Sequence, residues 1–138
     1  MKEKNQKKVS GRYKGKRGER DLFRYLSKFG WKGRRIPASI VDGFATKNNR
    51  IVFFEVKTTK NNNVKIPKEQ VKRLYDWLEY FSYYPIREAV SAVRFTKARK
   101  WVFIKMDEIR DYTINLSTKS TWAPLSDQEI NLFTWSSK

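Results

Sequence analysis

Apolar residues recur along two stretches of the chain with the three- and four-residue spacing of an amphipathic helix. The first stretch covers residues 17–29, and Gly30 follows it at the position where helices often end in a glycine. The second begins at Pro67, and proline is tolerated in the first turn of a helix. Both stretches therefore predict helices with one apolar side. Their apolar positions are Leu22, Phe23, Leu26 and Phe29 in the first helix and Val71, Leu74, Leu78 and Phe81 in the second.

Shorter apolar runs bounded by polar residues predict strands before and after the second helix. The polar residues 47–50 and 96–99 predict tight turns between neighbouring strands. The order of one helix, three strands, one helix and two strands predicts an α/β fold, in which helices flank a central mixed β-sheet. The predicted strands cover residues 31–36, 40–46, 51–58, 89–95 and 100–105, with a weaker edge strand at 112–116 and a short helix at 126–135.

The length of 138 residues suits one domain. Residues 1–16 are rich in lysine, asparagine and glycine and almost free of apolar residues, which is typical of a flexible basic arm. We expect residues 17–138 to form a single domain. No apolar run approaches the ~20 residues that span a bilayer, and no apolar stretch follows the basic N-terminus as it does in a signal peptide. We therefore expect a cytoplasmic protein.

The chain contains no cysteine and no histidine. The first absence excludes disulfides, zinc fingers and thiol catalysis. The second excludes mechanisms that need imidazole as a base or metal ligand, Ser-His-Asp hydrolysis among them. Any catalysis must therefore rest on carboxylates, lysine, hydroxyl groups, water and metal ions.

Lysine and arginine total 31 against 14 aspartates and glutamates, which gives a formal net charge of +17. Such an excess most often indicates a polyanionic partner. An anionic membrane surface is the alternative, but no long helix combines a basic face with a bulky apolar face. Aromatic residues make up 15% of the chain, which would also suit a non-catalytic protein that stacks on single-stranded nucleic acid.

Two charged residues, Glu55 and Lys57, lie inside the most apolar predicted strand, where a charge is costly unless it is paired or binds a metal ion. Because side chains alternate along a strand, Val56 can face the core while its two neighbours share the other face. Asp42, in the preceding strand, can meet Glu55 at one end of the sheet. Carboxylates and the Val56 carbonyl are ligands of the kind that magnesium prefers, and Glu19 projects near the apolar side of the first helix. These residues predict a metal-dependent nuclease, with an ion pair on an ordinary sheet face as the alternative.

Four short stretches, in order, resemble the PD-(D/E)xK nuclease superfamily and, more narrowly, the archaeal Holliday-junction resolvases. A weaker similarity at residues 103–105 extends the resemblance to the last strand. Two features depart from the family: Val41 stands before Asp42 in place of proline, and only two residues separate Ser39 from Asp42. The shortened loop leaves room for a viral member or another nuclease of the superfamily. The four stretches are residues 15–20, residues 35–39, residues 42–47 together with 55–57, and residues 68–70.

The resemblance implies a restriction-endonuclease-like core and a single nuclease domain over residues 17–138. It implies paired nicking of a four-way DNA junction by a homodimer, since a two-fold substrate suits a two-fold protein. Another repair or restriction-like nuclease and a non-catalytic protein that binds branched DNA remain the alternatives. The implied site residues are Glu19, Asp42 and Glu55 as ligands of Mg²⁺ (or Mn²⁺) together with the Val56 carbonyl, Lys57 as a catalytic residue, Ser39 as a loop serine implicated in catalysis, and Gln70 as a neighbour of the site.

Two further sets of residues complete the prediction. Basic residues near the N-terminus and the candidate site are expected to contact DNA phosphates. Aromatic residues beside the apolar stripe of the second helix exceed what a small monomer needs and are expected at a dimer surface, with Trp122 and Trp135 as the alternative. The DNA-binding set is Lys7, Lys8, Arg12, Lys14, Lys16, Arg17, Arg20, Arg34, Arg35 and Lys60, and the dimer set is Trp77, Tyr80 and Tyr84.

Overall fold

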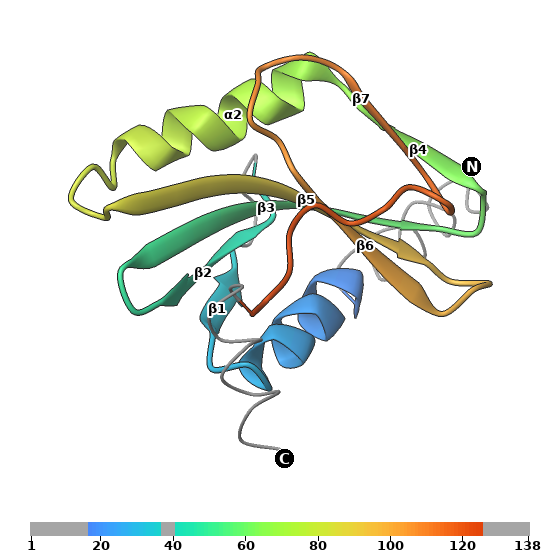
Figure 1. Ribbon diagram of the computed structural model, residues 1–138, viewed down its shortest axis with the longest axis horizontal. Coiled ribbons are helices and arrows are strands. Elements are labelled where there is room, and N and C mark those ends of the chain that lie inside the picture. The colour runs from blue at the N-terminus through green and yellow to red at the C-terminus, as the bar shows by residue number, and fades with distance from the viewer. Residues whose placement is uncertain (1–16, 37–40, 126–138) are drawn as a thin grey trace, which may run out of the picture.

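The chain folds into three layers, with a central sheet between the N-terminal helix on one side and helix α2 on the other (Figure 1). The computed structural model describes residues 17–36 and 41–125. The predicted basic arm with Lys7, Lys8, Arg12, Lys14 and Lys16, the loop residue Ser39 and the predicted helix at 126–135 lie outside the described residues. The elements are the N-terminal helix (helical over residues 17–27), β1 (Lys32–Arg35), β2 (Gly43–Lys47), β3 (Arg50–Thr59), β4 (Asn63–Ile66), α2 (Lys68–Glu79), β5 (Ile86–Phe95), β6 (Lys100–Lys105) and β7 (Tyr112–Asn115).

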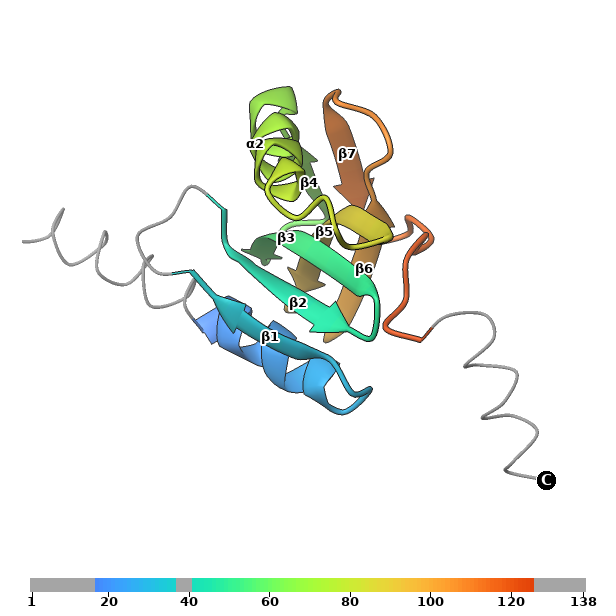
Figure 2. The ribbon, with the colours of Figure 1, turned by 90° about the vertical axis from the view of Figure 1, so that its left-hand side faces the viewer.

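The main sheet has five strands in the order β1-β2-β3-β5-β6. Strands β3 and β5 are parallel and α2 lies in the connection between them, whereas the other neighbours pair antiparallel. The predicted mixed sheet flanked by helices is therefore confirmed. Beside α2, β4 and β7 form a separate antiparallel pair (Figure 2).

The small β4–β7 sheet departs from the sequence prediction in two ways. Strand β4 was not predicted, because its four residues are too short to show a clear alternation of apolar and polar positions. The predicted edge strand at 112–116 forms, but it pairs with β4 and not with the main sheet. Pairing partners are set by tertiary contacts, which a single short apolar run does not encode.

Strand β3 is apolar on both faces because both faces are covered. Ile51 and Phe53 pack into the apolar cluster that includes α2, β4 and β7. Val52 and Phe54 pack into the opposite cluster, which contains Leu22 and Leu26 of the N-terminal helix. Trp122, from the segment after β7, covers the same side and contacts the ring of Phe54. The run Ile51–Phe54 therefore forms the centre of the molecule.

The ends of the elements show how the sequence signals act. Gly30 has a φ of +85°, and the backbone N–H groups of residues 30 and 31 donate to the carbonyls of residues 27 and 26. This is the Schellman arrangement that a glycine favours at a helix end.

Pro67 is the N-cap of α2 and not its first helical residue, a shift of one position. Asp42 precedes β2 and is not inside it, which corrects the prediction of a strand over 40–46. In the described part of the chain, no helix is both long and apolar enough to cross a membrane.

Candidate active site

The candidate site lies at the end of β3 where its apolar run meets charged residues. The Glu55 side chain is 5% exposed, and its residue sits beyond Phe54 on the face that α2 covers. Lys57 shares that face, and its ammonium group lies 3.2 Å from the Glu55 carboxylate. Because a buried carboxylate loses its hydration, this ion pair offsets part of the cost of burying Glu55.

Asp42 joins the site because β2 runs antiparallel to β3. Gly43, the first residue of β2, pairs with Phe54, so Asp42 reaches the level of Glu55 and Val56. The Val56 backbone N–H donates to the Asp42 carboxylate at 2.6 Å. This hydrogen bond holds the aspartate in place at the point where regular β2 pairing begins.

Glu19 of the N-terminal helix reaches Asp42. The two side chains form a hydrogen bond. The helix can approach this closely because glycines stand at the contact, Gly18 on the helix and Gly43 on β2. A Cβ on Gly18 would lie 2.3 Å from the Thr58 hydroxyl oxygen, and one on Gly43 would lie 2.4 Å from the Phe23 ring. Substitution at either glycine would therefore push the helix, and Glu19 with it, away from the strand.

The electrostatics of the cluster favour a positive charge. Burial and the neighbouring Asp42 raise the pKa of Glu55 from 4.5 to about 7, although Lys57 and Arg73 lower it. Burial also raises the pKa of Asp42, against the Val56 N–H, Glu19 and Lys57. Two carboxyl groups hydrogen-bond to each other only when they share a proton. The contact between Glu19 and Asp42 therefore brings a third carboxyl group to the cluster.

The donor set fits a hard divalent cation. Magnesium prefers oxygen ligands and usually takes one or two carboxylates, with waters and substrate phosphate completing its shell. Asp42 and Glu55 supply a half-buried and a buried carboxylate that lie side by side, and one lysine balances only part of their charge. Among residues 17–36 and 41–125, no three acidic side chains are grouped closely enough to hold one ion together. The predicted ligand trio of Glu19, Asp42 and Glu55 stays a prediction.

Helix α2 adds Arg73 to the electrostatic surroundings of Glu55 and also carries the predicted site neighbour Gln70. The side-chain carbonyl oxygen of Gln70 is buried and has no hydrogen-bond partner in the described structure. Arg73 follows three residues later on the same helix side and acts electrostatically on Glu55. The sequence prediction named Gln70 and missed Arg73, whose spacing from Gln70 was the available signal.

The described members of the predicted DNA-binding set lie around two cavities beside the N-terminal helix. Arg17 and Lys60 line a cavity of about 560 Å³. Arg20, Arg34 and Arg35 line another of about 470 Å³, together with Arg24, which the sequence prediction missed. Arg35 also lies 4.0 Å from the Glu19 carboxylate, which ties this basic surface to the candidate site.

The predicted dimer residues occupy the far end of α2. Trp77 is half-buried and stacks on Phe53. Tyr80 is 79% exposed and Tyr84 is half-buried against Phe81. Trp77 is thus partly a core residue, whereas Tyr80 presents its ring to solvent. The alternative residue Trp122 is buried in the core, and Trp135 lies outside the described residues.

Comparison with known proteins places this geometry among junction-cutting nucleases. The sequence profile of the archaeal Holliday junction resolvase (hjc) family matches residues 10–126. The crossover junction endodeoxyribonuclease Hje of Sulfolobus acidocaldarius is 32% identical over 108 residues, covering 74% of this chain and 76% of the relative. A crossover junction endodeoxyribonuclease of Sulfolobus islandicus rod-shaped virus 1 is 36% identical over 78 residues, covering 52% of this chain and 64% of the viral one.

A solved structure shows the same fold. The Archaeoglobus fulgidus protein Hjc, a Holliday junction resolvase, superposes with a TM-score of 0.61 at 26% sequence identity. The match covers 75% of this chain and 85% of that one. The similarity therefore extends over most of both chains.

Proposed function

The chain belongs to the archaeal Holliday junction resolvase family, and from this premise we propose that it cuts four-way DNA junctions by metal-dependent hydrolysis. The observation that carries the proposal is the cluster of Glu55, Asp42 and Lys57 at the end of β3, where a nearly buried carboxylate faces a like charge. A structural ion pair needs one carboxylate and one cation, and a second carboxylate beside it adds repulsion. A nuclease site needs both carboxylates, because together they bind a metal ion.

Asp42, Glu55 and the Val56 carbonyl would hold Mg²⁺, or Mn²⁺ in its place. Such an ion supplies an activated water and neutralises charge on the phosphate. The Lys57 side chain is one-third exposed, so its ammonium group is accessible to the phosphate or the attacking water. Glu19 orients Asp42, and Arg35 in turn lies against Glu19.

The basic surface beside the N-terminal helix supports DNA binding. Arginines pair with phosphates through two parallel N–H donors, and such contacts position DNA without reading its sequence. Arg20, Arg24 and Arg34 are exposed and lie next to the candidate site through Arg35. The lysines and arginine of the predicted arm would extend this contact. A surface of this kind suits recognition of junction shape.

We also propose that the protein acts as a homodimer in the cytoplasm, with the exposed end of α2 at the interface. Tyr80 and Tyr83 are 79% and 75% exposed, and Ile86 is 41% exposed. Aromatic side chains are enriched at the cores of interfaces. Sedimentation of the Tyr80→Glu variant should show a monomer where the parent shows a dimer, and a parent that is monomeric at micromolar concentration would contradict the proposal.

The function is tested with an immobile four-way junction and a linear duplex of the same sequence, each with Mg²⁺ and with EDTA. We expect paired nicks in the junction only, and none in EDTA. The Asp42→Asn variant should bind the junction as the parent does but leave it uncut. Asp107→Asn, an exposed aspartate paired with Lys105, is the matched control and should cut normally.

Each contrary result has its own meaning. Equal cutting of the linear duplex would identify another nuclease of the superfamily. Tight binding of the junction by the parent without cutting in either metal would identify a non-catalytic binding protein.

A further inference from the structure

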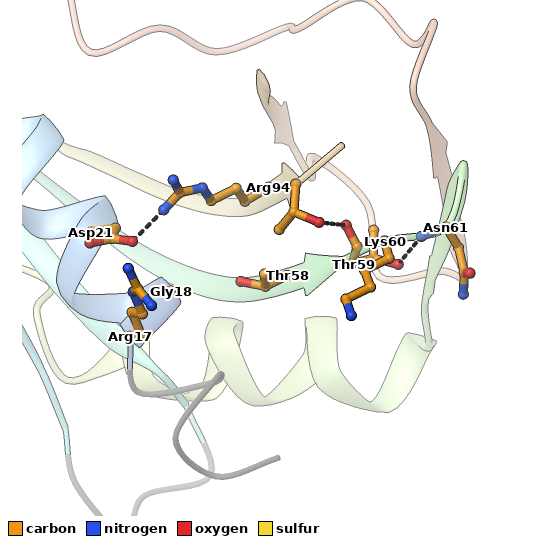
Figure 3. Close-up of a pocket in the computed structure, with 9 residues that line it drawn as sticks. Arg17, Gly18, Asp21, Thr58, Thr59, Lys60, Asn61 and Arg94 are labelled. Carbon is orange, nitrogen blue, oxygen red and sulfur yellow. Dashed lines mark hydrogen bonds and ion pairs between the residues drawn. The ribbon is translucent and has the colours of Figure 1, made fainter. Parts of the chain in front are cut away.

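A cavity of about 560 Å³ lies between the start of the N-terminal helix and the ends of β3 and β5 (Figure 3). Cavities of several hundred Å³ are of the size that binds small molecules and parts of larger ligands. Two of its residues, Arg17 and Lys60, belong to the predicted DNA-binding set, whereas Arg94 and Thr58 have no role in the function described so far. Its lining is Arg17, Gly18, Asp21, Thr58, Thr59, Lys60, Asn61, Arg94 and Thr96.

The lining carries more positive than negative charge. Arg17, Lys60 and Arg94 supply three cations, and Asp21 is the one carboxylate among the nine lining residues. Arg94 extends along the cavity to Asp21 and forms an ion pair with it (Figure 3). The side chains of this pair are 35% and 25% exposed. Arg94 is therefore accessible to a ligand, although in the free protein its guanidinium is paired with the Asp21 carboxylate.

The cavity adjoins the candidate active site across a single strand. Thr58 follows Lys57 along β3, and adjacent Cα atoms are about 3.8 Å apart. Their side chains point to opposite faces of the sheet, so Lys57 faces the catalytic cluster and Thr58 faces the cavity. Gly18 and Glu19 of the N-terminal helix likewise contact the two sites. Gly18 abuts Thr58 at the cavity, and Glu19 contacts Asp42 in the catalytic cluster.

The position of the cavity suits the backbone of a DNA strand that reaches the catalytic cluster. A DNA strand carries one phosphate at every nucleotide. A strand with one phosphate at the cluster could therefore place another at the adjoining cavity, where three cations and the hydroxyl groups of the threonines gather.

We propose that this cavity binds a backbone phosphate of the DNA strand being cut, and that Arg94 exchanges Asp21 for that phosphate when DNA binds. Arginine pairs with carboxylates and phosphates through the same planar fork of N–H donors, so one can replace the other. Asp21 keeps the half-buried guanidinium paired and oriented in the free protein. The inference rests on the proposed function, since it deepens the account of how the same site takes its substrate.

The test measures binding of the four-way junction in EDTA, without cutting, at several salt concentrations. Losing one phosphate contact lowers the slope of log K against log salt by about 0.9. We expect Arg94→Gln to show that change and to bind about tenfold more weakly. Lys119→Ala removes one positive charge from a different cavity and should alter both quantities less. Lys60→Ala, an exposed residue of the lining, gives a second variant that does not endanger folding.

Asp21→Asn gives the sharper result, because it removes the group that competes with DNA. The variant should bind the junction several-fold more tightly, and more so than Asp107→Asn, which also removes one negative charge. The gain should disappear in the Asp21→Asn/Arg94→Gln double variant. A gain that persists without Arg94 would overturn the exchange, as would an Asp21→Asn protein that is only less stable and binds no better.

Cutting by the parent separates this inference from the proposed function. If the parent cuts junctions while Arg94→Gln and Lys60→Ala leave the salt slope unchanged, the phosphate subsite is wrong and the function stands. If the parent never cuts but its binding depends on Arg94 as described, the subsite stands and the nuclease proposal is wrong. If the parent binds neither junction nor duplex, both are wrong.

Discussion

Two glutamates on neighbouring strands, Glu55 of β3 and Glu88 of β5, are buried to nearly the same extent but are surrounded differently. Glu55 is 5% exposed and Glu88 is 8% exposed. Glu55 has one close cation, Lys57, and a like charge at Asp42. Glu88 lies 2.8 Å from the Arg50 guanidinium and 3.7 Å from the Lys105 ammonium group, and Trp122 Nε1 approaches it at 3.5 Å.

The surroundings of Glu88 suit a structural role, whereas those of Glu55 suit a role in catalysis. Around Glu88, two cations and an N–H donor replace the lost hydration, and Arg50 also stacks on Trp31. The network thereby joins β3, β5, β6 and the segment that follows β7. Around Glu55 the compensation is incomplete, and burial and Asp42 raise its pKa to about 7. Burial alone does not single out a candidate functional acid, whereas burial together with uncompensated charge does.

The largest expected effect is on DNA cleavage and concerns Glu55, the glutamate whose charge is incompletely compensated. Replacing Glu55 with glutamine removes a proposed metal ligand, and metal-ion catalysis supplies several kcal/mol of transition-state stabilisation. We expect Glu55→Gln to lower the rate of junction nicking by about 10³-fold or more. Single-turnover nicking measures the rate. Glu88→Gln, assayed where it is folded, should cut at close to the parental rate, and a comparable loss there would remove the distinction.

The next effect concerns stability at the other end of the comparison. Glu88→Gln leaves the Arg50 guanidinium, whose side chain is 16% exposed, without its carboxylate. Breaking one side of a buried ion pair costs about 3–5 kcal/mol. Urea unfolding should show a loss of that order. Ser91→Ala on the same strand is the control, because the Ser91 hydroxyl is buried without a hydrogen-bond partner and its removal should be neutral or stabilising.

The stability of the protein should also depend on pH through Glu55. The pKa of Glu55 is about 7 in the folded protein against an ordinary 4.5, so between these values the folded state holds a proton that the unfolded chain has lost. The free energy of unfolding therefore falls as pH rises from 4.5 to about 7. Glu55→Gln removes this dependence, and its stability relative to the parent should rise across the window by on the order of 3 kcal/mol.

Denaturation series at pH 5 and pH 8 measure this difference, without divalent ions. Asp42, whose pKa is shifted in the same direction, should behave similarly when replaced with asparagine. Added Mg²⁺ should reduce the parent's decline, because a bound cation favours the ionised carboxylates. A parent and a Glu55→Gln variant with parallel pH profiles would show that Glu55 is compensated as well as Glu88 is.

The smallest effect tests how the partners of Glu88 rank. Trp122→Phe keeps a large ring in the core and removes only the N–H group that lies 3.5 Å from the Glu88 carboxylate. A hydrogen bond to a charged group contributes about 1.5–3 kcal/mol at good geometry, but this one is long and therefore weaker. We expect a stability loss of less than about 1 kcal/mol beyond that of the smaller ring. A loss near that of Glu88→Gln would mean that Trp122, and not Arg50, dominates the network.

Local patterns predicted much of the fold. The helical spacing of Leu22 and Leu26, the apolar run Ile51–Phe54 and the glycine at position 30 were sufficient for both helices and for the five strands of the main sheet. The small β4–β7 sheet was not predictable, because four-residue strands carry little pattern and their pairing depends on distant residues. The cluster of Glu19, Asp42, Glu55 and Lys57 was also predicted from the sequence, helped by its resemblance to a nuclease family.

The sequence alone determined which residues are present for chemistry: carboxylates and lysine without histidine or cysteine, in a strongly basic chain. It also determined that Glu55 would be buried, because it continues an apolar strand. Only the tertiary structure decided that Glu88 would face Arg50 and Lys105, and that the charge around Glu55 would stay incompletely compensated. The physical reason is that the protonation and charge of a buried group depend on its neighbours in space. Those neighbours are set by strand order and register, which no local pattern records.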